Sequence, residues 1–182
     1  MRYAAILLAA AATSCMNSEP PPNRHESPEA ALSAARRAVS AKDLPGYLDT
    51  LTESYVRVLM ANSIAECIYQ NHPAVAARSR PWKGCQDILA EAGWTKDLGS
   101  TPQAFKSAAD QIRDPRRLYA ALESSRGTKL AWDHLDPIKV SELVVSGKTA
   151  RATAEWKTGG AGPIIFEKDD TGWRMNPHLE PR

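Results

Sequence analysis

The chain has 182 residues, of which 43% are hydrophobic and 24% charged, and its formal net charge at pH 7 is +2. This length corresponds to one domain of ordinary size. The near balance of 23 basic and 21 acidic residues provides no electrostatic basis for binding nucleic acid, so we exclude that class of partner.

The first fourteen residues are typical of a secretory signal peptide. Arg2 supplies a positive charge, and Tyr3 to Ala12 form an apolar run. A run of about ten residues fits the hydrophobic region of a signal but is too short to span a bilayer, which takes about 20 residues. Two small residues, Thr13 and Ser14, then precede Cys15.

The segment Ala12-Thr13-Ser14-Cys15 resembles the lipobox of bacterial lipoproteins. The resemblance implies that residues 1–14 are removed, that the thiol of Cys15 is acylated (for example with palmitate), and that the protein is anchored to a membrane of the cell envelope. The folded part would then lie outside the cytoplasm, on the periplasmic face. The alternative is an ordinary signal peptide with Cys15 incidental. Residues 15–27, which include three consecutive prolines, are predicted to be an extended tether.

Two cysteines remain if Cys15 is lipidated. In an oxidising compartment, Cys67 and Cys85 predict one disulfide, with two buried free thiols as the alternative. The two cysteines lack the spacing and the histidine partners of a zinc site, and no motif for a cofactor is present. We therefore predict neither a metal nor a cofactor.

Residues 28–126 have the apolar spacing of helices. Ser27 before Pro28 is a capping residue followed by a proline in the first turn, and this pattern begins a helix. A second helix is predicted to start near Leu44 and to run, with a break near Asn62, to about residue 70, followed by a loop at 78–83. Three more helix starts are predicted at Cys85, at Thr101-Pro102 and at Asp114-Pro115.

Residues 128–176 have the pattern of a β-meander. The first strand, around 138–145, has a one-residue slip near Glu142 that predicts a bulge. Strand 149–157 alternates strictly, and a hairpin follows. We predict a single α+β domain over 28–182, with N-terminal helices packed on one face of a C-terminal antiparallel sheet of about four strands. A possible apolar pocket on that face would be lined by Ala152, Ala154, Trp156, Ile164, Phe166, Trp173 and Met175.

Two stretches, "SPEAALSAARRAVSAKDLPGYLDTL" and "VSGKTARATAEW…GPIIFEKDDTGWRM", resemble the cystatin-like, nuclear-transport-factor-like α+β superfamily. That superfamily includes small envelope lipoproteins of unknown function, and also isomerases, cyclases and dehydratases. The resemblance implies a cavity between a curved sheet and its helices. The middle of the chain, about Ser54 to Arg126, departs from the pattern because it is longer and more helical.

The inward register of the predicted sheet carries no ionisable side chain, which argues against cavity-based catalysis. The sequence therefore favours a non-catalytic binding module for a small apolar ligand, a peptide or an envelope protein. The alternative is an isomerase or hydrolase in which His134, between Asp133 and Asp136, is the general base. The same three residues also fit a polar link between the last helix and the sheet. A purely structural role within an assembly is a third possibility.

Overall fold

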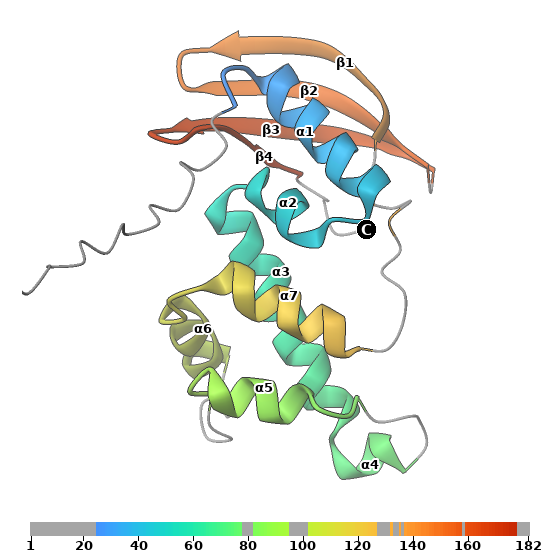
Figure 1. The fold of residues 1–182 in the computed structure, drawn as a ribbon, viewed down its shortest axis with the longest axis vertical. Coiled ribbons are helices and arrows are strands. Elements are labelled where there is room, and N and C mark those ends of the chain that lie inside the picture. Colours follow the sequence, from blue (N-terminus) through green and yellow to red (C-terminus); the bar gives the residue numbers. More distant parts are fainter. Residues whose placement is uncertain are drawn as a thin grey trace, which may run out of the picture.

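The computed structural model describes residues 25–77, 82–94, 102–126, 132, 135, 137–157 and 159–177. Helices come first and a sheet follows, so the predicted α+β order is confirmed (Figure 1). The elements are α1 (Pro28–Ala41), α2 (Leu44–Asp49), α3 (Glu53–Gln70), α4 (Pro73–Ala76), α5 (Cys85–Glu91), α6 (Pro102–Asp110), α7 (Pro115–Ser125), β1 (Pro137–Ser146), β2 (Thr149–Trp156), β3 (Ala161–Asp169) and β4 (Gly172–Asn176).

The sheet is an antiparallel meander in the order β1-β2-β3-β4. The register of β1 on β2 shifts between Ser141 and Val144, and Glu142 has a φ of 58°. A non-glycine residue in the left-handed region is uncommon and marks a local irregularity of the strand. The predicted bulge is therefore confirmed at the predicted residue.

Helix α1 covers one face of the sheet (Figure 1). Its first turn is capped by Ser27, whose Oγ accepts a hydrogen bond of 3.2 Å from the backbone N–H of Ala30. The apolar residues of α1 repeat at helical spacing and are buried. The alternate alanines of β2, on the face of the sheet that α1 covers, are buried as well. These α1 residues are Ala31, Leu32, Ala35, Ala38 and Val39. The hydrophobic effect thus fixes α1 on this side of the sheet.

The predicted second helix is wrong as a single element, because residues 50–52 interrupt it. The backbone N–H of Thr52 donates to the Met175 carbonyl at 2.8 Å, and the N–H of Met175 donates to the Thr50 carbonyl at 2.7 Å. Thr52 then caps α3, which continues to Gln70 with no break at Asn62. Pairing with β4, which no local pattern encodes, outweighs the helical preference at this position.

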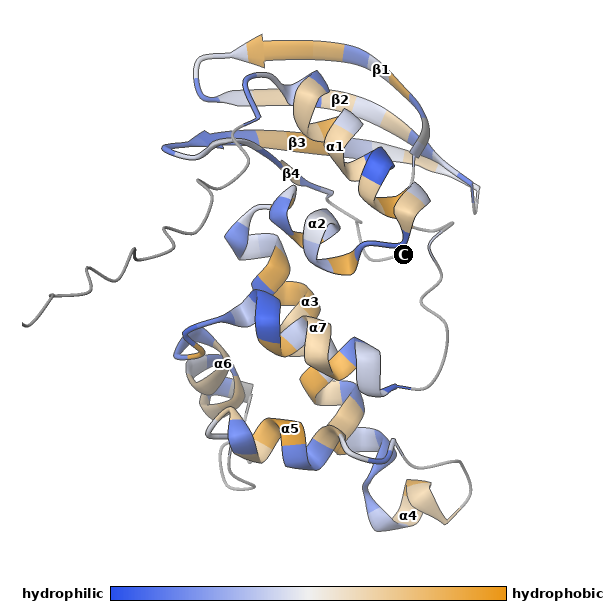
Figure 2. Ribbon diagram, in the orientation of Figure 1, coloured by the Kyte–Doolittle hydropathy of each residue, from blue (hydrophilic) through white to orange (hydrophobic). Residues whose placement is uncertain are grey.

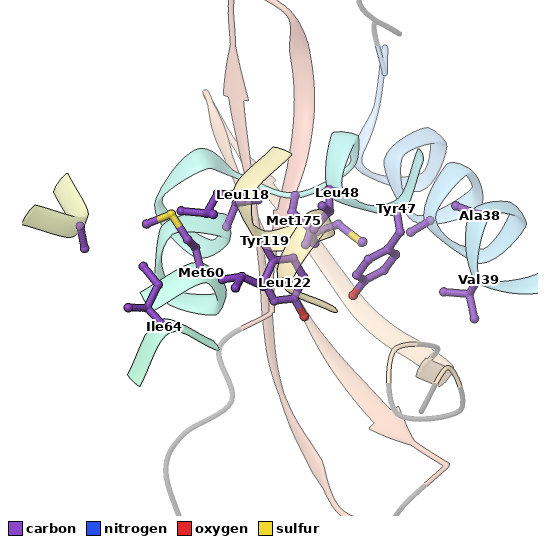
Figure 3. Packing of buried hydrophobic residues seen from close by; sticks show 14 of the residues in the cluster. Ala38, Val39, Tyr47, Leu48, Met60, Ile64, Leu118, Tyr119, Leu122 and Met175 are labelled. Carbon is purple, nitrogen blue, oxygen red and sulfur yellow. The ribbon is translucent and has the colours of Figure 1, made fainter. Parts of the chain in front are cut away.

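The helices α3, α5, α6 and α7 pack on one another rather than on the sheet. One hydrophobic core still joins the two halves, as Figure 3 shows. Tyr47 and Leu48 of α2 lie beside Met175 of β4, and Met60 of α3 lies beside Leu122 of α7. The sheet, α1 and the helical half therefore share one continuous hydrophobic core.

The outer edge of β4 is closed by hydrogen bonds. His25 accepts a hydrogen bond of 2.8 Å through its carbonyl from the backbone N–H of Trp173, and residues 50–52 bond to Met175 beside it. His25 is only 8% exposed. The folded domain therefore includes His25, which the sequence predicts to lie in the tether.

Candidate functional site

The strand β1 is the open edge of the sheet. It pairs with β2 on one side, and among the described residues no backbone segment pairs with its other side. An unpaired edge presents a row of free N–H and C=O groups that another extended chain can bind. Because hydrogen bonds already cover the edge of β4, strand addition is available at β1.

Two adjacent valines on this edge are exposed to solvent. Val144 is 66% exposed and Val145 is 53% exposed. Figure 2 shows the C-terminal part of β1 as hydrophobic. Val144 lies opposite Arg151, whereas Val145 lies opposite the buried Ala150, so the two valines point to opposite faces of the sheet. The exposed apolar surface therefore surrounds the edge on both sides.

An open hollow of about 580 Å³ lies on the outer face of the sheet, away from α1. Its apolar lining includes Val144 and Ile165, which flank Arg151 across the register. Hydroxyl groups and one carboxylate complete it, and the Oγ1 of Thr153 donates a hydrogen bond of 3.2 Å to the Oε2 of Glu142. The side chain of Arg151 has no hydrogen bond or ion pair to a described residue.

A second open hollow, of about 340 Å³, lies between α1 and β1. Its apolar walls are Leu32 of α1, Leu143 of β1 and Phe166 of β3, and Glu29 stands at its border. A hydrogen bond with the Ser27 hydroxyl, followed by one with the backbone, lowers the pKa of the Glu29 carboxyl group. Glu29 is therefore a carboxylate at neutral pH. The two hollows flank the same strand, one on each face.

Most of the residues predicted to line an apolar pocket fill the core instead. Trp156 is half-buried, and the other six are at most 5% exposed because α1 and α2 pack against that face. These six are Ala152, Ala154, Ile164, Phe166, Trp173 and Met175. Only Phe166 of the predicted set also reaches the hollow beside α1.

The predicted disulfide between Cys67 and Cys85 is present. It joins the end of α3 to the start of α5 over a sequence separation of 18, and both cysteines are fully buried. Asn71 supports it by donating from Nδ2 to the Cys67 carbonyl at 2.9 Å and to the Trp82 carbonyl at 3.1 Å. Burial and these contacts mark a structural rather than a reactive disulfide.

A half-buried polar cluster beside the disulfide holds α3 to α7. Arg126 forms ion pairs through Nη2 with Glu66 at 2.6 Å and with Glu123 at 3.2 Å, and its guanidinium lies 4.6 Å from the ring centroid of Trp82. Ser63 donates to Glu123 at 2.7 Å. No local sequence pattern predicts this cluster, because its residues are far apart in the chain. Its opposite charges pair through Nη2 of Arg126, while Nε of Arg126 is buried without a hydrogen-bond partner among the described residues. We assign the cluster to stability.

Several predicted residues lie outside the part of the chain that the structure describes. They are Cys15, with its signal and most of its tether, and the group Asp133, His134 and Asp136. Within the described part, no cluster of three or more histidine, cysteine, aspartate or glutamate side chains could hold a metal ion. None of the described helices is long and apolar enough to cross a membrane.

One feature of the sequence does indicate the exposed edge of β1. Val144 and Val145 are adjacent, so one of them must lie outside the buried face of a half-buried strand. The position of Glu29 across from that strand depends on how α1 crosses the sheet.

In comparisons with models of protein families, with curated proteins and with solved structures, nothing matches this chain.

Proposed function

We propose that this chain is a lipid-anchored envelope protein with a non-catalytic binding domain, and that the domain binds an extended segment of a partner protein along β1. The observation that carries the proposal is the free edge of β1 with exposed valines on both of its faces. A strand added there would gain main-chain hydrogen bonds, and its alternate side chains would enter the two hollows.

The shape of the described surface favours an extended segment over a small enclosed ligand. Both hollows are open, and the face of the sheet beneath α1 is filled by core side chains. Sites for small molecules bury most of their ligand in a cleft or cavity. Shallow hollows on the two sides of one strand instead suit a chain whose side chains alternate in direction.

The bulge confines the binding region to the second part of β1. Residues before Glu142 include Pro137, which has no N–H, and Lys139, which pairs with Glu155 at 3.5 Å. Proline and lysine are the residues that commonly protect a sheet edge. Residues 143–146 carry no charge. A partner strand therefore pairs with residues 143–146.

The anchor is proposed from the lipobox-like segment that ends in Cys15. The chain from Cys15 to His25 can reach roughly 35 Å at full extension. Such a tether keeps the domain close to the membrane surface, where it meets envelope proteins or their exposed segments. Two acyl chains are needed for stable anchoring, since one gives only marginal binding.

The lipid anchor is tested directly by mass spectrometry of the mature protein. We expect the N-terminal residue to be Cys15 with acyl chains attached, and we expect Cys15→Ser to move the protein from the membrane to the soluble fraction. A mature protein that starts elsewhere and carries no acyl chain would show that the segment is an ordinary signal peptide.

Strand binding is tested with two valines that are equally exposed. Val145 of β1 and Val58 of α3 are each 53% exposed. A library of linear hexapeptides is selected against the full-length chain in detergent, and the affinity of the selected peptides is measured by fluorescence anisotropy. We expect Val145→Asp to weaken binding roughly tenfold or more, and Val58→Asp to leave it unchanged.

Both variants are checked by circular dichroism and thermal unfolding, so that a loss of binding is separated from a loss of structure. Peptides that lose affinity equally with Val58→Asp, or that tolerate Val145→Asp, would place the binding surface elsewhere and contradict the proposal.

A further inference from the structure

We infer that the segment bound along β1 carries opposite charges on its two faces, a lysine or arginine toward α1 and an aspartate or glutamate toward Arg151. This inference rests on the proposed function, because it names the chemistry of the strand that β1 would bind. It follows from the charges that border the two hollows.

The hollow beside α1 selects a long basic side chain. Its walls are apolar, and Glu29 stands at its border. Glu142 also borders this hollow, but its carboxylate accepts a hydrogen bond from Thr153 on the outer face. A lysine or arginine can lay its aliphatic stem on Leu32 and Leu143 and bring its charge to Glu29.

The hollow on the outer face selects an acidic side chain. Arg151 is exposed there between Val144 and Ile165, and its guanidinium has no partner among the described residues. The other charged groups on this face already have partners: Lys139 pairs with Glu155, and the Glu142 carboxylate accepts a hydrogen bond from Thr153. A carboxylate from the bound strand can take two parallel hydrogen bonds from Arg151.

Because side chains alternate in direction along a strand, the two charged sites together select one register of the bound segment. Neighbouring residues of a strand point to opposite faces, so a basic and an acidic residue that are adjacent in the partner satisfy both sites at once. A shift by one residue exchanges the faces and brings like charges together at both sites. The preferred partner segment thus has adjacent basic and acidic residues flanked by apolar ones.

A second copy of this chain does not meet these requirements through its own β1. Its inward residues there, Leu143 and Val145, are apolar, and its one lysine, Lys139, lies on the outer face in an ion pair with Glu155. A second copy would therefore bring no basic side chain to Glu29. Charge complementarity favours a different protein as the partner.

The test compares two hexapeptides of identical composition with acetylated and amidated ends. In Val-Thr-Lys-Glu-Val-Thr, lysine shares a face with the valines. In Val-Thr-Glu-Lys-Val-Thr, glutamate does. Affinities for the full-length chain are measured by fluorescence anisotropy at low salt. We expect the first peptide to bind roughly fivefold more tightly, since two partly exposed charge pairs are gained and two repulsions are avoided.

The variant Glu29→Lys/Arg151→Glu reverses both protein charges without changing the net charge. We expect it to reverse the preference between the two peptides. A matched control is Lys83→Glu/Glu91→Lys, which makes the same exchange at exposed positions in the helical half and should leave the preference as it is in the wild-type chain.

The outcomes distinguish a failure of this inference from a failure of the proposed function. Equal binding of both peptides, unaffected by the charge reversal but abolished by Val145→Asp, would overturn the charge preference and leave strand addition standing. Failure of both peptides and of every library peptide to bind at β1 would overturn the proposed function itself. Concentration-dependent dimerisation that Val145→Asp abolishes would identify a second copy as the occupant and also overturn the inference.

Discussion

Replacing Trp82 by alanine lowers the free energy of unfolding by about 3–5 kcal/mol, as expected for the loss of a large buried aromatic side chain. Trp82 is 3% exposed, and its Nε1 donates a hydrogen bond of 2.9 Å to Ser125 of α7. Its ring also stacks on Arg126. Chemical denaturation followed by circular dichroism measures the change. A loss of this size is a large share of the stability of an ordinary domain.

Two controls divide the effect into packing and hydrogen bonding. Trp82→Phe keeps an aromatic ring but loses the indole N–H, and we expect it to cost about 1–2 kcal/mol. The Ser125 hydroxyl keeps a hydrogen-bond partner in this variant, because it also donates to the Leu122 carbonyl at 2.8 Å. Tyr69→Ala on exposed α3 should change stability by less than about 0.5 kcal/mol. A similarly small effect of Trp82→Ala would show that residue 82 does not join the core.

Removing the disulfide with Cys67→Ala/Cys85→Ala lowers the free energy of unfolding by about 3 kcal/mol. In the chain-entropy model, a cross-link across a loop of this length restricts the unfolded chain by that amount. Urea denaturation of the variant, and of the wild-type chain with and without a reductant, measures the difference. Cys15→Ser is the control, since Cys15 is not part of the bond.

The two stability changes are not expected to add. Asn71 contacts both the disulfide and the Trp82 carbonyl, so each variant alters a partner of the other. A double-mutant cycle should show coupling of about 0.5 kcal/mol or more. A loss below about 1 kcal/mol for the cysteine pair, with strict additivity, would indicate that the loop is already constrained without the bond.

Much of the local structure could be predicted because it depends on short patterns. Serine or aspartate followed by proline begins α1 and α7, where Ser27 and Asp114 accept the expected capping hydrogen bonds. The apolar residues of β1 depart from strict alternation at Glu142, and this departure predicts the bulge that the structure contains. The pairing of Cys67 with Cys85 followed from the number of cysteines and the expected compartment.

The contacts that the sequence analysis missed join residues distant in the chain. The helix was predicted to continue through Thr50–Thr52, yet the backbone there bonds to Met175, more than 120 positions away in the chain. Trp82 lies outside the helices, as the predicted loop at 78–83 requires, but it is buried and donates a hydrogen bond to Ser125 of α7. His25 was assigned to the tether, but its carbonyl closes the edge of β4. In each case the partner lies far away in the sequence, so no local pattern predicts the contact.

The sequence by itself determined the α+β class, the capped starts of α1 and α7, the bulge and the apolar face of β2, because each depends on local spacing and on the burial of one face. Only the tertiary structure decided which part of the surface is open. The apolar face that could have been a pocket is filled by α1 and α2, and the edge of β4 is covered by His25 and by residues 50–52. The edge of β1 is therefore the part of the sheet that a partner can bind. The sequence alone does not predict this, because strand order and helix placement arise from long-range packing that no short stretch of the chain specifies.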